Sequence, residues 1–258
     1  MSIAPKKSLG QHFLRDANIR DKIIDLLEAE ENDCVVEIGP GTGALTGHLA
    51  ARYPKLEAVE IDERAIAHLK ESMPAIPVHH ADVVKYDWAT HAAAAGEKIH
   101  VIGNLPYYVT SQVVFSLLDA HEHIAEAVMM MQREVAERLV AHPRTKAYGI
   151  LSVAVQQLTT PHLAFRVSRN VFYPKPDVES AVVRLVFDKD PEILPGTDAV
   201  WLRKVVRAAF NQRRKTLRNS LGQLAASCNG EVPEAWRKKR AEELSPSEFA
   251  LLAQQLRA

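Results

Sequence analysis

The 258-residue chain is poor in cysteine, with only Cys34 and Cys228, and aromatic residues make up 6% of it. Two cysteines cannot form a disulfide framework, and their spacing matches no metal-binding motif. We therefore expect both to be structural thiols in a reducing compartment, and we predict no metal site. The composition is also not that of a disordered or fibrous protein, because 47% of the residues are hydrophobic and 25% are charged, as in ordinary globular proteins.

Long hydrophobic runs are absent as well. The longest apolar stretches, such as Tyr148–Val155, are interrupted by glycine or serine. They fall short of the roughly 18 to 20 residues that a membrane span needs. The first residues, Met1–Leu14, carry basic side chains but no apolar core of the kind found in signal peptides. We therefore expect a cytoplasmic protein that does not interact with a membrane.

Net charge is also lacking, since 32 basic residues balance 32 acidic ones. Taken alone, this balance argues against binding nucleic acid through bulk charge. The balance is uneven along the chain, however: residues 1–200 hold 20 basic and 27 acidic residues, whereas residues 201–258 hold 12 and 5. Such asymmetry indicates a nucleic-acid contact surface in the carboxyl-terminal part.

The chain is long enough for one large domain and a small partner. Residues 188–198 are rich in proline, glycine and aspartate, which predicts a linker between the two. We place the first domain at residues 1–190 and the second at residues 191–258.

Short apolar runs alternate with segments of helical spacing before this linker, which predicts an α/β domain with a mostly parallel sheet. After the linker the pattern is helical, and Ser245–Glu248 forms a capping box that begins the last helix. Ala147–Gln157 is compatible with a helix or a strand. The predicted strands are Cys34–Ile38, Leu56–Ile61, Val78–His80, Ile99–Ile102, Ala125–Met131 and Ser180–Phe187, and the predicted helices are Thr42–Ala51, Glu63–Ser72 and Thr110–Leu118.

A glycine-rich turn, Glu37–Gly43, follows the first predicted strand and precedes a helical segment. Backbone at this turn must approach a ligand closely, which favours glycine at Gly39 and Gly41. Glu60 lies about twenty residues further on, at the end of the next strand, where a carboxylate can accept hydrogen bonds from both hydroxyls of a ribose. Together the two features predict a nucleoside-containing cofactor, whereas the turn alone could be purely structural.

The identity of this cofactor depends on the residues beside the turn. The spacing is G-x-G-x-G, not the G-x-G-x-x-G that seats a pyrophosphate, and the Glu37 carboxylate would repel one. A cationic ligand suits this carboxylate, and S-adenosylmethionine, with a sulfonium and an ammonium group, is the common one. Asp82 follows the third predicted strand and can accept a hydrogen bond from an adenine amino group, but a helix cap is the alternative.

The chemistry is expected at Gly103–Tyr107, which follows the fourth predicted strand at the carboxyl edge of the sheet. The exocyclic nitrogen of adenine is a poor nucleophile, because its lone pair is delocalised into the ring. The Asn104 side-chain oxygen and the Leu105 carbonyl can accept hydrogen bonds from this amino group and so favour the charge that develops on attack. Pro106 fixes the backbone, and Tyr107 can stack on a flipped base. We predict that Asn104, Leu105, Pro106 and Tyr107 are the catalytic residues.

These motifs give the chain a resemblance to the ribosomal RNA adenine dimethyltransferases, and specifically to those of the bacterial small subunit. The resemblance covers nearly the whole chain. It is carried by residues Leu9–Leu14, Val36–Gly43, Gly103–Tyr107, Gln132–Leu139, Phe172–Val183 and Ala209–Leu221.

The resemblance implies a class I, Rossmann-like α/β methyltransferase domain with a small all-α domain, and S-adenosylmethionine as the cofactor. It also implies a reaction and a partner: methylation at N6 of two adjacent adenosines in the 3′-terminal hairpin of 16S rRNA, in the assembling 30S subunit. The positions that match the family's cofactor contacts are His12, Leu14, Gly39, Glu60, Asp82 and Asn104, to which the glycine turn adds Gly41.

Two positions depart from the family's pattern. His12 stands where many members have asparagine, and either side chain can hydrogen-bond the cofactor. Tyr108 stands where asparagine is often found, so whether Tyr107 or Tyr108 faces the base is open. The resemblance also implies that Phe172 lines the other side of the base, with a core or lid aromatic as the alternative.

A basic segment, Arg203–Arg218, holds seven basic residues and no acidic one. We predict that Arg207, Arg214 and Arg218 contact RNA phosphates, with a solvated basic face as the alternative. The helical projection places Arg213 among apolar residues, so we expect the helix to break near Asn211 and Gln212. A second basic cluster, Arg237–Arg240, favours neither interpretation.

Three other functions stay open. A large-subunit rRNA adenine N6-methyltransferase would share the cofactor motifs, although the segment 213–221 and the Phe172 loop favour the small-subunit enzyme. An RNA-binding assembly factor with secondary methylation is a second alternative. A nicotinamide dehydrogenase is disfavoured, because no candidate acid or base follows the turn. We expect a monomer.

Overall fold

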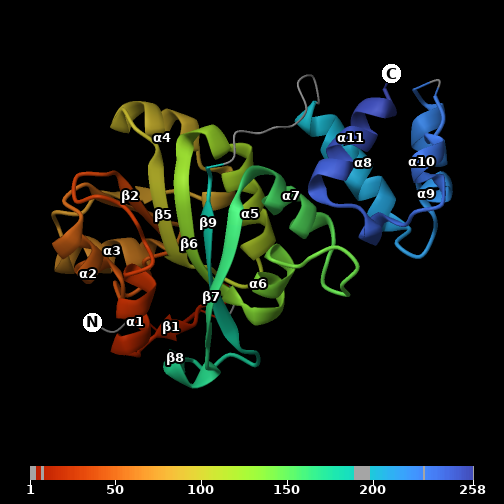
Figure 1. Cartoon of the computed structure of the whole chain (residues 1–258). Helices are drawn as coiled ribbons and strands as arrows, with labels where there is room; N and C mark the ends of the chain where they lie inside the picture. Colours follow the sequence, from red (N-terminus) through yellow and green to blue (C-terminus); the bar gives the residue numbers. More distant parts are fainter. Residues whose placement is uncertain (1–3, 7–8, 189–197, 229, 258) are drawn as a thin grey trace. The chain divides into compact units, whose positions relative to one another are not determined.

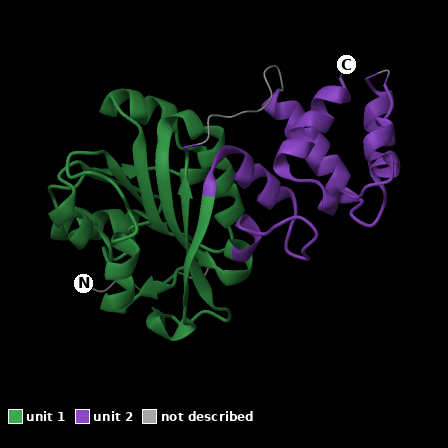
Figure 2. Ribbon diagram, viewed as in Figure 1, with its two compact units in different colours: residues 1–136, 161–187 green, residues 137–160, 188–258 purple. Residues whose placement is uncertain are grey.

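The computed structural model describes residues 4–6, 9–188, 198–228 and 230–257, and the chain divides into two compact units. Residues 1–136 and 161–187 form the first, which we call the sheet unit. Residues 137–160 and 188–258 form the second, the helical unit (Figure 2). The predicted linker lies almost entirely outside the described residues.

The sheet unit is built on a seven-stranded sheet, shown in Figure 1. Strands β4, β3, β2, β5 and β6 pair in parallel, and β9 adds to β6 in the antiparallel direction. In spatial order the strands are β4 (Val78–His80), β3 (Leu56–Glu60), β2 (Val35–Ile38), β5 (Ile99–Asn104), β6 (Ile124–Gln132), β9 (Ser180–Val186) and β7 (Thr160–Val167).

The order of the strands reverses between β2 and β5, which lie side by side although β3 and β4 separate them in sequence. In open α/β sheets such a switch point leaves a crevice beyond the carboxyl ends of the two strands, and ligands bind there. The glycine turn follows β2, and Asn104 ends β5. Both sequence motifs therefore lie at the crevice, as their positions predicted.

Helices connect the strands, and aspartate side chains begin several of them. Asp16, Asp62 and Asp87 each accept a hydrogen bond from a backbone N–H of the first turn, which satisfies a group that the helix itself leaves unpaired. The helices of this part of the chain are α1 (Ala17–Ile24), α2 (Thr46–Arg52), α3 (Glu63–Ser72), α4 (Trp88–Ala95), α5 (Thr110–Asp119) and α6 (Arg133–Leu139).

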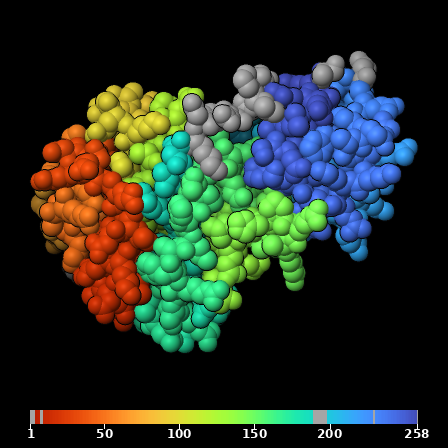
Figure 3. Space-filling view, viewed as in Figure 1, coloured from red at the N-terminus to blue at the C-terminus, as the bar shows by residue number. Residues whose placement is uncertain are grey.

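A two-stranded sheet joins the amino-terminal segment to a late part of the chain. Strand β1 (Phe13–Leu14) pairs antiparallel with β8 (Phe172–Tyr173), and the Arg15 N–H donates to the Val171 carbonyl. In Figure 3 the amino-terminal residues, in red, accordingly border the segment around β8, in green. This pairing fixes the residues that precede β1, which include His12.

The helical unit has its own hydrophobic core. Trp201, Leu202 and Phe249 pack in it together with Tyr148 and Val153, which precede the predicted linker. The division predicted at residue 190 missed this, because the apolar face of residues 137–160 is covered by the carboxyl-terminal helices. The helices are α7 (Ile150–Leu158), α8 (Ala199–Asn211), α9 (Leu217–Ala226), α10 (Glu234–Arg237) and α11 (Pro246–Gln255).

The structure confirms the predicted strands and helices, with shifts of a few residues at their ends. The ambiguous segment 147–157 is a helix, α8 ends at Asn211 as expected, and the Ser245 hydroxyl accepts from the Glu248 N–H in the predicted capping box. In the part of the chain that the structure describes, no helix combines the length and the apolar character that spanning a membrane would require.

Candidate cofactor and active site

A cavity lies at the switch point, at the carboxyl edge of β2 and β5. Three stretches line it: residues 9–14, residues of the turn between 39 and 45, and residues 104–108, together with Glu37, Glu60 and Ile61. The structure thus brings His12, Leu14, Gly39, Gly41, Glu60 and Asn104–Tyr107 together, as predicted from the sequence.

The glycine turn depends on backbone that only glycine adopts easily. Gly39 and Gly41 have φ angles of 63° and 57°, in the left-handed region. A Cβ at Gly41 would also come within 3.0 Å of the Phe13 ring. Both the conformation and the closeness of β1 therefore require glycine at position 41.

Glu60 ties the turn to the end of β3. One of its carboxylate oxygens accepts from the Gly41 N–H at 3.2 Å, and the other accepts from the N–H groups of Ile61 and Asp62 at 2.8 and 2.9 Å. The carboxylate is held in place at 6% residue exposure on the cavity wall. The first oxygen keeps a lone pair for a further donor such as a ribose hydroxyl.

Glu37 is a buried acid with an unsatisfied oxygen. The residue is 2% exposed, it lines the cavity, and no group in the described part of the chain hydrogen-bonds its Oε2. Burial raises the pKa of Glu37 to about 8. A buried acid without a donor is costly unless a ligand supplies one. The site therefore fits a cofactor that carries positive charge.

Asn104 is oriented by the amino-terminal segment. Its Nδ2 donates to the His12 carbonyl at 3.0 Å, which leaves Oδ1 as the acceptor available to a ligand. The His12 Nδ1 lies 2.7 Å from the Pro174 carbonyl. Because a carbonyl only accepts, Nδ1 carries a proton, and Nε2 is the ring nitrogen left for a ligand. The departure from asparagine at position 12 thus keeps a hydrogen-bonding group at the site.

The two adjacent tyrosines differ in their surroundings. The Tyr107 hydroxyl is 2.7 Å from the Ser180 hydroxyl, and its ring stacks on His12 with centroids 5.4 Å apart. Burial raises the pKa of Tyr107, so the ring is a neutral phenol. Tyr108 is 58% exposed and covers Gly10, where a Cβ would lie 3.2 Å from its ring.

Two predicted site residues do not line this cavity. The Asp82 carboxylate accepts from the Val84 N–H at 3.0 Å, so it acts as the helix cap that the sequence left as an alternative. Phe172 is 5% exposed and lies in the hydrophobic core with Leu14, opposite which it pairs. The structure therefore gives Phe172 the place of a core aromatic, because it packs in the hydrophobic cluster that contains Leu14, Val167 and Val182.

Gln11 and Ile61 are among the cavity residues that were not singled out from the sequence. Gln11 donates to Asp62 at 3.0 Å and accepts from the Lys6 N–H, which places it against the loop after β3. Ile61 is 48% exposed and follows Glu60. The only available signal was adjacency, since Gln11 lies inside the Leu9–Leu14 motif and Ile61 lies next to Glu60.

The basic residues of the segment 203–218 belong to the helical unit. Arg213 is structural: its guanidinium bonds Glu242 and the carbonyls of Thr145 and Lys146. Arg207, Arg214 and Arg218 are exposed, and no ion pair of theirs is found within the described residues. Their charge is available to a partner, as the predicted phosphate contact requires.

Comparison with known proteins identifies the family. The profile described as ribosomal RNA adenine dimethylase matches residues 4–257. This chain belongs to that family. A relative named ribosomal RNA small subunit methyltransferase A, from Salinibacter ruber, is 52% identical over 98% of this chain and 86% of its own length. The protein of the same name from Pelotomaculum thermopropionicum is 45% identical over 97% of this chain and 91% of its own.

Solved structures agree with this assignment. A dimethyladenosine transferase from Plasmodium falciparum has a TM-score of 0.78 and 27% identity, covering 93% of this chain and 96% of its own. The 23S rRNA methyltransferase ErmE has a TM-score of 0.69 and 27% identity, over 95% of this chain and 100% of its own. The fold is therefore the predicted class I methyltransferase fold with carboxyl-terminal helices.

Family membership settles the reaction class. The protein is an rRNA adenine dimethyltransferase that depends on S-adenosylmethionine, as predicted. The alternative of a nicotinamide dehydrogenase is thereby excluded. A cation beside Glu37 would favour the ionised form of this acid, so Glu37 and the fixed Glu60 carboxylate are the groups in this cavity that fit the cationic and ribose parts of the cofactor.

Proposed function

We propose that this enzyme methylates N6 of two adjacent adenosines in the 3′-terminal hairpin of 16S rRNA, giving N6,N6-dimethyladenosine in the assembling 30S subunit. The observation that carries the proposal is the fixed amide of Asn104, which lines a cavity with Glu37 and Glu60 and whose Nδ2 is bonded to His12, leaving Oδ1 as the acceptor. Support for the small subunit comes from the names and the high identity of the relatives.

The chain's own groups activate the adenine amino group. The Asn104 Oδ1 and the Leu105 carbonyl accept its two N–H bonds, which raises electron density on the nitrogen as it attacks. The Leu105 N–H is bound to the Met130 carbonyl at 2.9 Å, which fixes the peptide that presents this acceptor. The Pro106 carbonyl accepts from the Val109 N–H and from the Thr110 hydroxyl, which anchors the following turn.

No general base is needed for this chemistry. S-adenosylmethionine, when bound, supplies a methyl group on a sulfonium, which is an excellent leaving group. The residues around it contribute position and electrostatics, and the proton of the amino group leaves to solvent after transfer. The side of the cavity formed by Tyr107 and His12 offers aromatic surface to a flipped base.

RNA would be held by the helical unit. Arg207, Arg214 and Arg218 are exposed in it and are proposed to contact phosphates of the rRNA in the 30S subunit. The proposal takes the enzyme to be a monomer that acts in the cytoplasm without contact to a membrane.

A large-subunit enzyme is the second candidate, and the likeness to ErmE favours it. The lower identity to ErmE than to the small-subunit relatives argues against it. The test offers labelled S-adenosylmethionine with 30S or 50S subunits that both lack their adenine methylation. We expect methyl transfer to the 30S subunit. Transfer to the 50S subunit alone would assign the enzyme to the large subunit.

The same assay separates catalysis from an assembly role. An Asn104→Ala variant that binds 30S subunits and supports their maturation without methyl transfer would make RNA binding the main function. We expect maturation to be impaired together with methylation. Glu71→Gln, at an exposed position of α3 outside the cavity, is the control that keeps both.

A further inference from the structure

The opposite edge of the sheet brings four donor side chains together. Cys34 immediately precedes β2, Glu57 is the second residue of β3, and His79 is the second residue of β4. Val36 pairs opposite Glu57, and Val59 pairs opposite His79. Because side chains alternate along strands, Cys34, Glu57 and His79 project from the same face.

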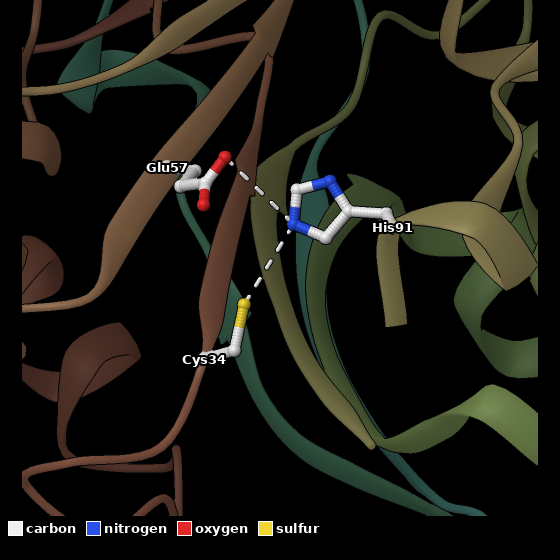
Figure 4. A group of neighbouring side chains, drawn as sticks. All are labelled: Cys34, Glu57 and His91. Atoms are coloured by element: carbon white, nitrogen blue, oxygen red, sulfur yellow. Dashed lines mark hydrogen bonds and ion pairs between the residues drawn. The ribbon is translucent and has the colours of Figure 1, made fainter. Parts of the chain in front are cut away.

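Helix α4 supplies the fourth side chain. His91 points from α4 toward Cys34 and Glu57, as Figure 4 shows. Its Nε2 lies 3.7 Å from the Cys34 Sγ and 3.8 Å from the Glu57 Oε2, and the donor atoms of these three residues all lie within 4.8 Å of one another. The Nε2 of His79 contacts the same Glu57 oxygen.

The two separations from the His91 Nε2 come close to those of a tetrahedral zinc site. With Zn–S of about 2.3 Å and Zn–N or Zn–O of about 2.0 to 2.1 Å, tetrahedral angles place the ligand atoms roughly 3.3 to 3.6 Å apart. The separations around the His91 Nε2 need a change of only a few tenths of an ångström. The Nε2 of His79 lies outside this group of three, so its ring has to turn away from Glu57 and toward Cys34 and His91 to become the fourth ligand.

Neighbouring groups hold two of the donor residues in place, as hydrogen-bond partners of metal ligands do in known metal sites. The Tyr86 hydroxyl is 2.6 Å from the His91 Nδ1, so the remote nitrogen of the ring is held while Nε2 faces the cluster. The Cys34 backbone is fixed on both sides, since its N–H donates to Glu97 and its carbonyl accepts from the His100 N–H.

Charge and access also suit a cation. Glu57 and Glu97 lie beside the Cys34 thiol, and Lys55, which bonds Glu97, offsets part of their charge. The side chains of Glu57 and His79 are 30% and 39% exposed, whereas Cys34 is 2% exposed and the His91 side chain 8%. An ion can therefore enter past His79 and reach a buried sulfur.

We propose that this cluster binds one Zn²⁺ through the Cys34 Sγ, a Glu57 oxygen, and the Nε2 atoms of His79 and His91. The mixed sulfur and nitrogen donors favour zinc over magnesium or calcium, which prefer oxygen ligands. The thiol proton leaves to solvent when the Zn–S bond forms. The ion would link β2, β3 and β4 to α4 at the edge of the sheet away from Glu60, and its role would be structural.

The test titrates the metal-free full-length protein with Zn²⁺ and with Co²⁺ as a spectroscopic probe. We expect one equivalent of either ion, a sulfur-to-cobalt charge-transfer band, and the intense visible bands of four-coordinate Co²⁺. Cys34→Ser removes the charge-transfer band, whereas Cys228→Ser keeps it. His91→Gln and His79→Gln each weaken Zn²⁺ binding by about tenfold or more.

His80 is the matched control, because it is the next residue of β4, is exposed, and projects from the other face. His80→Gln should bind Zn²⁺ as the wild type does. Zn²⁺ should raise the Tm of the wild type and of His80→Gln but raise that of His79→Gln less. The proposal is overturned if Co²⁺ gives no thiolate band. It is equally overturned if His79→Gln binds Zn²⁺ as tightly as His80→Gln, a comparison that holds even if Cys34→Ser does not fold.

Discussion

At the scale of single residues, the site is built from carboxyl and amide groups whose hydrogen bonds are only partly used. Glu60 is fixed by three backbone N–H groups, whereas the buried Glu37 keeps an oxygen without a partner. Asn104 has one side of its amide committed to His12 and the other free. Binding of a cationic cofactor and of an adenine amino group would complete these interactions.

The raised pKa of Glu37 predicts a pH-dependent stability cost in the cofactor-free enzyme. The ordinary pKa of this acid is 4.5, and burial raises it to about 8 in the folded chain. The folded state therefore holds the proton more tightly than the unfolded state. The associated stability is complete below pH 4.5 and is lost as the pH rises to about 8.

Glu37→Gln removes this dependence, because an amide does not ionise. Urea unfolding at pH 5 and pH 8 should show that the variant gains stability relative to the wild type as the pH rises. A difference between the two proteins that is equal at both pH values would contradict the assigned burial of an acid. The same variant should bind S-adenosylmethionine more weakly, since it lacks the carboxylate that a cationic group would meet.

Asn104→Ala tests the proposed activation of the amino group. We expect kcat to fall by about 100-fold or more, the scale of removing one preorganised hydrogen-bonding group from an active site. Single-turnover methyl transfer to undermethylated 30S subunits measures this effect. Glu71→Gln, at an exposed position of α3 that does not line the cavity, serves as the control, and its kcat should change by less than about threefold. Equal losses in the two variants would remove Asn104 from the proposed role.

At the scale of elements, the strand of the catalytic motif is bound tightly to its neighbour. Gly103 of β5 lies opposite Ile38 of β2, and a Cβ at Gly103 would come within 2.6 Å of the Ile38 carbonyl oxygen. Because the atom that a Cβ would meet belongs to the backbone of a paired strand, it cannot move without disturbing the sheet. The small residue lets β5 present Asn104 beside the glycine turn.

Two glycine substitutions should therefore have opposite effects on stability. Gly103→Ala is expected to lower the free energy of unfolding by about 1 to 3 kcal/mol through overpacking. Gly222→Ala, in helix α9 with open space around it, should raise it by about 0.5 to 1 kcal/mol. Denaturant unfolding of both variants checks the pair. A neutral Gly103→Ala would show that the two strands are farther apart than described.

Most of these elements could be predicted because their patterns are local. The buried strands β2, β3 and β6 are mostly apolar, with isolated polar residues among them, and Ser245 carries a complete capping box. Helix α4 was missed because its alanine tract has no polar alternation. The strand Thr160–Val167 was not predicted either, although exposed and half-buried residues alternate along most of it.

The candidate site was predictable only where backbone chemistry specifies the residue. Gly39, Gly41, Glu60 and Asn104 sit at turns and strand ends that need those residue types. Whether Asp82 and Phe172 reach the cavity depends on pairings far apart in sequence, such as β1 with β8. The cluster around Cys34 could not be seen in the sequence for the same reason, because its donors come from the residue before β2, from β3 and β4, and from helix α4.

At the scale of the whole molecule, zero net charge conceals an acidic part and a basic part of the chain. Residues 201–258 hold 12 basic and 5 acidic residues, and several of the arginines there are exposed. The guanidinium of Arg213 is engaged in hydrogen bonds within the helical unit. Binding to RNA should therefore depend on the positions of a few exposed arginines and little on the net charge of the chain.

Replacing Arg207, Arg214 and Arg218 with alanine should weaken RNA binding. It should also flatten the dependence of log K on log salt by roughly 0.7 to 0.9 for each phosphate that the variant no longer neutralises. Affinity for S-adenosylmethionine should not change. Filter binding across a salt series and calorimetry with the cofactor measure the two effects. An unchanged salt slope would place the RNA-binding surface elsewhere.

The most direct test of the proposed function is mass analysis of the 3′-terminal hairpin of 16S rRNA after reaction with undermethylated 30S subunits. The account predicts two adjacent adenosines, each carrying two methyl groups on N6, and no modification with the Asn104→Ala variant. A hairpin that stays unmethylated, or methyl groups at any atom other than N6, would contradict it.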